Sequence, residues 1–119
     1  MSENRRALVV DDNATNRMLA KALLARLGWV VDEADCGETA LKQFSTQDYP
    51  LILLDISMPG LSGEETCMEI RKTGKPTHII AYTAHAFPEE RARFLGLGFD
   101  DILVKPINRL ELEAQISKL

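Results

Sequence analysis

Short apolar segments of strand composition alternate along this chain with segments of helical period. The strand-like segments, rich in Val, Ile and Leu, are 7–10, 29–34, 51–54, 78–82 and 102–104. The segments between them repeat apolar residues every three or four positions, which is the spacing of one helix face. Successive β–α units require parallel strands, because each helix carries the chain back across the sheet. The alternation therefore predicts an α/β fold with a doubly wound parallel sheet between two helical layers.

Capping residues indicate where the helices begin. Ser62 with Glu65, and Asp35 with Glu38, have the spacing of a capping box, and Asn108 stands before the last helical segment. The first helix ends at Gly28, a residue that commonly follows a helix. The side chains that we expect this helix to bury are Met18, Leu19, Ala22, Leu23 and Leu27.

Length and composition narrow the class of protein further. The 119 residues suit one domain, and we expect residues 1–119 to form it. A net charge of −4 argues against direct nucleic-acid binding, which needs a basic face. No apolar run approaches the ~20 residues of a membrane span, so we expect no membrane insertion and a cytoplasmic location. Cys36 and Cys67 lack the spacing of a zinc site and are expected to be reduced thiols.

Polar residues follow four of the five predicted strands. Asp11 and Asp12 end the first, Asp55 the third, Thr83 the fourth and Lys105 the fifth. Parallel strands present all their carboxyl ends at one edge, and ligands bind there, where the strand order reverses. With the order 2-1-3-4-5 that reversal lies between strands one and three, so we expect the three carboxylates to converge.

Three converging carboxylates need a positive partner. Two such charges ~5 Å apart repel by about 3 kcal/mol at an effective dielectric of 20. Oxygen ligands with an open side favour Mg²⁺, and Lys105 and Thr83 add a cation and a hydroxyl donor, as phosphoryl transfer requires. Taken singly, each acid has a simpler interpretation as a turn or cap residue, and Asp12 or Asn13 could cap the first helix. The joint placement at one edge favours a site.

With these residues in view, the sequence resembles the receiver domains of two-component response regulators. The resemblance covers nearly the whole chain and implies a flavodoxin-like (βα)5 fold. Its motifs are LVVDDN at 8–13, LLDISMPG at 53–60, TA at 83–84 and LVKP at 103–106. The residues at 11–13, 16–17 and 83–88 are most similar to those of receivers in hybrid sensor histidine kinases.

The resemblance implies a role for each site residue. Asp55 is similar to the aspartate that accepts a phosphoryl group from a phosphohistidine. Asp12 resembles the direct Mg²⁺ ligand, Asp11 acts largely through water, and the backbone carbonyl of Ser57 completes the protein ligands. Mn²⁺ could substitute for Mg²⁺. Lys105 resembles the lysine that pairs first with Asp55 and then with the phosphoryl oxygens.

The switch residues follow from the same resemblance. Thr83 resembles the hydroxyl that moves toward the phosphoryl group after transfer, and the peptide bond before Pro106 is a candidate for the cis form. Ile102 replaces the aromatic residue that rotates inward in many receivers. Tyr82 is expected to point away from Thr83, because side chains alternate along a strand.

Two further residues flank the predicted pocket. Ser57 and His85 stand two positions after Asp55 and Thr83. One interpretation is that they are solvated rim residues. The other is that they tune hydrolysis of the phosphoryl group by placing or blocking the attacking water.

The implied partners are a histidine kinase, a histidine phosphotransfer protein, or both, with the first helix as the docking element. The domain would assist its own phosphoryl transfer and dephosphorylation without being a conventional enzyme. Three alternatives stay open at this point. They are a dehalogenase-type phosphatase, although Ser57 stands where the general acid would be, an FMN carrier, although Asp11 and Asp12 would repel its phosphate, and a degenerate receiver that only binds proteins.

Overall fold

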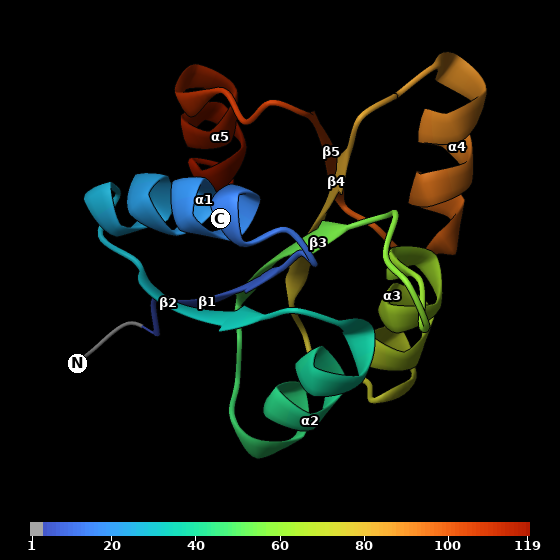
Figure 1. The fold of residues 1–119 in the computed structure, drawn as a ribbon. Coiled ribbons are helices and arrows are strands. Elements are labelled where there is room, and N and C mark those ends of the chain that lie inside the picture. The colour runs from blue at the N-terminus through green and yellow to red at the C-terminus, as the bar shows by residue number, and fades with distance from the viewer. Residues whose placement is uncertain (1–3) are drawn as a thin grey trace.

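The computed structural model describes residues 4–119, in which five parallel strands form one sheet. Their order is β2-β1-β3-β4-β5, as the sequence predicted (Figure 1). The chain leaves β1 in one direction to form β2 and then reverses to form β3, β4 and β5. The strands are β1 (Arg6–Val10), β2 (Val30–Ala34), β3 (Leu51–Asp55), β4 (His78–Thr83) and β5 (Asp101–Val104).

Helices cover both faces of this sheet, which confirms the doubly wound α/β architecture. Helices α1 and α5 lie on one face, and α2, α3 and α4 lie on the other (Figure 1). Among residues 4–119, none of the helices is long and apolar enough to cross a lipid bilayer. The helices are α1 (Ala14–Arg26), α2 (Gly37–Thr46), α3 (Gly63–Lys72), α4 (Pro88–Leu97) and α5 (Arg109–Ile116).

The core consists of two apolar clusters, one on each side of the sheet. One cluster joins Leu8, Val10 and Ile52 to side chains of α2, α3 and α4, such as Phe44 and Phe94. The other cluster joins the alternate residues of the same strands to α1 and α5. All five residues of β3 are buried, because this central strand is covered on both faces. Asp55, at its carboxyl end, is therefore buried as well.

Helix α1 buries a different face from the one that the sequence predicted. Its buried residues are Ala20 and Leu24, whereas Met18 is 62% exposed and Leu19 is 48% exposed. Ala22 is also exposed, and only Leu23 and Leu27 of the predicted face pack partly against the core. The prediction was wrong because apolar residues surround most of this helix, so periodicity alone did not distinguish the two faces.

Most of the predicted caps are present. Ser62 and Glu65 form a reciprocal capping box, and the side chain of Asn108 accepts a hydrogen bond from the backbone of Glu111. The predicted box of Asp35 and Glu38 was wrong. Helix α2 begins one residue later than the box requires, with Cys36 as its N-cap and no side-chain capping bond.

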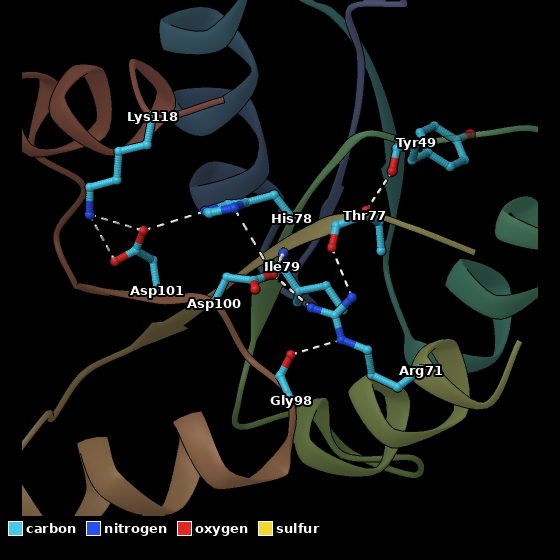
Figure 2. Close-up of polar contacts among 9 residues, drawn as sticks. All are labelled: Tyr49, Arg71, Thr77, His78, Ile79, Gly98, Asp100, Asp101 and Lys118. Atoms are coloured by element: carbon cyan, nitrogen blue, oxygen red, sulfur yellow. Dashed lines mark hydrogen bonds and ion pairs between the residues drawn. The ribbon is translucent and has the colours of Figure 1, made fainter. Parts of the chain in front are cut away.

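The amino edge of the sheet carries a polar network centred on Arg71 of α3 (Figure 2). The guanidinium donates to the carbonyl oxygens of Gly98 and Thr77, both at 2.8 Å, and to the carboxylate of Asp100 at 2.7 Å. The same carboxylate oxygen accepts a hydrogen bond from the backbone of Ile79 at 2.9 Å. Arg71 thus ties α3 to the loops that precede β4 and β5.

The network continues across the start of β5. His78 Nε2 lies 3.4 Å from a carboxylate oxygen of Asp101, which also lies 3.4 Å from Lys118 Nζ. Figure 2 shows His78 between the two neighbouring acids, Asp100 and Asp101. No sequence pattern indicates this network, because its partners come from segments far apart along the chain.

Candidate functional site

The acidic cluster forms where β1 and β3 end side by side. The two strands pair in parallel with Val10 opposite Leu54, so Asp11 and Asp55 follow adjacent strand positions. One carboxylate oxygen from each of Asp11, Asp12 and Asp55 lies within 4.8 Å of the other two. The sheet topology therefore brings together the three acids that the sequence placed at this edge.

Asp55 is buried against a cation. It is only 2% exposed, and its Oδ1 accepts a hydrogen bond from Lys105 Nζ at 2.9 Å. Burial raises the pKa of the Asp55 carboxyl and the charge of Asp11 adds to the rise, although the bond with Lys105 opposes it. Burial would lower the pKa of Lys105, but its contacts with Asp55 and Asp11 raise the pKa overall.

Asp11 has one satisfied oxygen and one that lacks a hydrogen bond. Oδ1 accepts a bond from the backbone of Asn13 at 2.9 Å. Oδ2 is buried and accepts none from the residues the structure describes; the nearby Lys105 Nζ lies 3.4 Å away. Lys105 therefore offsets part of the charge of this oxygen, and a metal ion in the cluster would offset more of it. The all-oxygen donor set, with Asp12 exposed beside it, fits a hard divalent ion such as Mg²⁺.

Thr83 faces its own loop at the end of β4. Its hydroxyl donates to the carbonyl oxygen of His85 at 3.0 Å and accepts from the backbone N–H of His85 at 3.3 Å. The His85 ring stacks on Phe87 with a centroid distance of 5.9 Å, and both side chains are exposed. The hydroxyl is thus held by the β4–α4 loop and not by Asp55.

Lys105 is held in place from its backbone. Its N–H donates to the carbonyl of Thr83 at 2.7 Å, and the peptide bond to Pro106 is cis. Its ammonium lies 5.0 Å from the centre of the Tyr82 ring. Tyr82 belongs to the core cluster of α1 and α5, and the buried Ile102 belongs to the other cluster.

Helix α3 starts in close contact with the end of β3. The N–H of Gly63 donates to the carbonyl of Ile56 at 3.1 Å. A Cβ at Gly63 would overlap the backbone carbonyl oxygen of Asp55, so no other side chain fits there. Only glycine permits this approach, so the first turn of α3 is fixed relative to Asp55.

A cleft of about 280 Å³ opens from Asp55 toward α3 and α4. Thr83 and Lys105 line it, as do the predicted rim residues Ser57 and His85. The backbone of Ser57 donates a long hydrogen bond of 3.4 Å to Asp55 Oδ1. The cleft therefore gathers the residues that follow strands three, four and five.

Three charged residues of this cleft were not predicted from the sequence, namely Glu64, Glu90 and Arg93. Arg93 Nη1 of α4 lies 2.7 Å from Glu64 Oε2 of α3. The two residues are 29 positions apart, and each belongs to a helix with many other charges. No local pattern connects them, so only the packing of α3 beside α4 shows the pair.

Comparison with known proteins places this architecture in one family. The model of the response regulator receiver domain matches residues 7–117. The sensor histidine kinase GacS of Pseudomonas protegens is 37% identical over 118 residues, which cover 95% of this chain. The same match covers only 13% of GacS, so the chain spans a small part of that curated relative.

Solved structures of similar proteins share the fold. The receiver domain of the sensor histidine kinase PA1611 from Pseudomonas aeruginosa is 34% identical with a TM-score of 0.87, covering 98% of this chain and 97% of that one. That structure has a magnesium ion coordinated in its active-site cleft. The response regulator TrrA from Thermotoga maritima, in complex with Mg²⁺ and BeF, is 41% identical with a TM-score of 0.85, covering 96% and 97%.

Proposed function

Since this chain belongs to the response regulator receiver domain family, we propose that Asp55 accepts a phosphoryl group from a phosphohistidine. The observation that carries the proposal is the state of Asp55: a buried carboxylate, bonded to Lys105, inside a cluster of three acids. Burial leaves its oxygen poorly solvated, and Lys105 keeps it ionised and oriented for attack.

In the transfer, an Asp55 carboxylate oxygen forms a bond to phosphorus as the bond from phosphorus to the donor imidazole nitrogen breaks. The electron pair of the broken bond stays on that nitrogen. Lys105, already bonded to Asp55, moves to the phosphoryl oxygens and balances their charge. Asp11, Asp12, Asp55 and the carbonyl of Ser57 would hold Mg²⁺, which when bound neutralises the phosphoryl oxygens.

The transferred group then acts on the loop after β4. Thr83 exchanges its hydrogen bond with His85 for one with a phosphoryl oxygen, which draws the loop inward. Ile102 is already buried in the core, so switching in this chain proceeds without an inward-rotating aromatic side chain at that position. Ser57 and His85 line the route by which water reaches the phosphorus, and we assign to them the tuning of hydrolysis.

The partners follow from the family and from α1. Met18, Leu19 and Ala22 form an exposed apolar face on this helix, next to the acidic cluster that follows β1. We assign this face to docking of a histidine phosphotransfer protein or kinase in the cytoplasm. The domain acts as a phosphoacceptor in a relay and not as a conventional enzyme.

The proposal is tested by the intact mass after incubation with acetyl phosphate. We expect one phosphoryl adduct that requires Mg²⁺ and is absent from the Asp55→Asn variant. A protein that forms no adduct and also fails to bind Mg²⁺ with fluoroberyllate would be a degenerate receiver. No structural observation favours that alternative, because Asp11, Asp12, Asp55 and Lys105 are all in place.

The roles of the rim residues need a separate measurement. We expect Ser57→Ala and His85→Ala to change the half-life of the phosphorylated protein, because both side chains border the cleft. The half-life is followed by the loss of adduct mass after the donor is removed. Equal half-lives in both variants and the original protein would make these residues solvated rim positions only.

A further inference from the structure

The cleft that Asp55 lines contains a second cation. We propose that Arg93 binds the phosphoryl group on Asp55, and that Glu64 is the ion-pair partner of Arg93 in the unphosphorylated protein. The inference rests on the proposed function and adds to it a residue for the same reaction. Its basis is that Arg93 and Glu64 line the same cleft of about 280 Å³ as Asp55, Thr83 and Lys105.

The ammonium of Lys105 already forms ion pairs with two carboxylates. Its ammonium lies 2.9 Å from Asp55 and 3.4 Å from Asp11. Phosphorylation replaces the single charge of the Asp55 carboxylate by about −1.5 to −2 charges at neutral pH, so the cleft gains up to about one negative charge beyond what Lys105 and a bound Mg²⁺ already meet. Of the residues described, Lys105 and Arg93 are the two cationic side chains that line the cleft. The added charge therefore favours movement of Arg93 toward Asp55.

The side chain of Arg93 is 54% exposed, so its reorientation costs little buried surface. The move would give up the ion pair with Glu64 and a cation–π contact of 5.1 Å with the ring of Phe94. Its partner Glu64 accepts one hydrogen bond of 2.7 Å. A phosphoryl group offers three acceptor oxygens, and the guanidinium fork binds such oxygens in pairs. The phosphoryl group is thus the stronger acceptor of the two.

Glu64 competes with the phosphoryl group for Arg93, and its backbone position is fixed. It follows Gly63, whose backbone packs directly against the carbonyl oxygen of Asp55. Arg93 instead belongs to α4, which follows the loop of Thr83. Exchange of Glu64 for the phosphoryl group would therefore release α4 from α3 and attach it to the modified end of β3. This transfers the local event at Asp55 to a helix at the surface.

The proposal predicts effects of opposite sign for the two partners. Loss of Glu64 removes a competitor and should strengthen binding of a phosphoryl mimic, whereas loss of Arg93 should weaken it. If the ion pair only ties α3 to α4, both substitutions break the same contact and shift binding in the same direction. The signs therefore distinguish a phosphoryl ligand from a structural tie.

The experiment is a calorimetric titration of the protein in Mg²⁺ with fluoroberyllate. We expect Arg93→Gln to weaken binding about two- to fivefold, the range of a partly exposed charge pair. Glu64→Gln should strengthen binding, and the double variant should bind as weakly as Arg93→Gln. Arg93→Lys, which keeps the charge but loses the fork, should fall between the original protein and Arg93→Gln.

A matched pair provides the control. Arg109 and Glu113 form an exposed ion pair of 2.8 Å on α5, outside the cleft, so Arg109→Gln and Glu113→Gln should leave binding unchanged. The role of Arg93 would be overturned if the Glu64 and Arg93 variants shifted the affinity for fluoroberyllate in the same direction, or if neither shifted it. It would also be overturned if the double variant kept the higher affinity of Glu64→Gln. An original protein that binds no fluoroberyllate and forms no Asp55 adduct would overturn the proposed function itself.

Discussion

The two edges of the sheet hold similar acidic residues in opposite electrostatic situations. At the amino edge, Asp100 and Asp101 each contact a cation, and the guanidinium of Arg71 uses Nε, Nη1 and Nη2 in hydrogen bonds (Figure 2). At the carboxyl edge, three acids gather around Lys105, and one oxygen of Asp11 is buried without a hydrogen bond from the described residues.

The difference distinguishes a structural network from a candidate functional site. Cationic partners lie against both acids at the amino edge, which favours a structural role for that network, and its buried His78 Nε2 contacts Asp101 without forming a hydrogen bond. The acids at the carboxyl edge are left with excess negative charge, which favours a cation and disfavours the empty site. Excess charge of one sign in a buried cluster is expected where a protein binds a counter-ion.

The largest expected difference between the edges is the response to Mg²⁺. At an ion concentration one hundred times the dissociation constant, binding adds about 2.7 kcal/mol to the free energy of unfolding. Thermal denaturation in MgCl₂, with NaCl at equal ionic strength as reference, measures this gain. We expect Asp12→Asn to lose most of it and Asp100→Asn to keep it. Equal stabilisation by both salts would contradict an ion site at the carboxyl edge.

Removal of Arg71 tests the amino edge. We expect Arg71→Met to lower the free energy of unfolding by about 2 kcal/mol, because it breaks the bonds to two carbonyl groups and leaves Asp100 without its guanidinium partner. Urea denaturation measures the loss. The exposed Arg109→Met should change stability by less than about 0.5 kcal/mol. A loss at Arg71 no greater than this control would show that the network is not structural.

The smallest expected effect is a rise in the free energy of unfolding when Asp55 is replaced by Asn. Burial raises the folded-state pKa of Asp55, so its ionisation opposes folding once the pH exceeds the ordinary carboxyl range. Without Mg²⁺ we expect Asp55→Asn to be more stable by about 1 kcal/mol at pH 7. The gain should vanish below about pH 4, where the acid is protonated in both states. Urea denaturation at both pH values measures it, and a less stable variant at pH 7 would contradict the comparison.

Asp100→Asn provides the matched substitution at the other edge. There the carboxylate has Arg71 as a partner, so neutralising it should lower stability at pH 7. Opposite signs at Asp55 and Asp100 would support the contrast between the two edges. Equal signs would mean that both acids are compensated in the same way.

Much of the site could be predicted because strand endings are a local property of the sequence. Asp11, Asp55, Thr83 and Lys105 each follow an apolar run, and parallel pairing then forces them to one edge. The capping box of Ser62 and Glu65 was predicted correctly for the same reason, since its two residues lie within one helical turn. The predicted cap at Asp35 was wrong because α2 begins one residue later than that cap requires.

The sequence by itself determined the order of elements, the parallel sheet and the set of residues at its carboxyl edge. Only the tertiary structure decided which face of α1 is buried, how Arg71 joins α3 to the loops before β4 and β5, and that Glu64 meets Arg93. The physical reason is the separation along the sequence of the residues that interact. Strand composition, helical period and capping depend on residues within a few positions, whereas these contacts depend on how separate helices pack against the sheet.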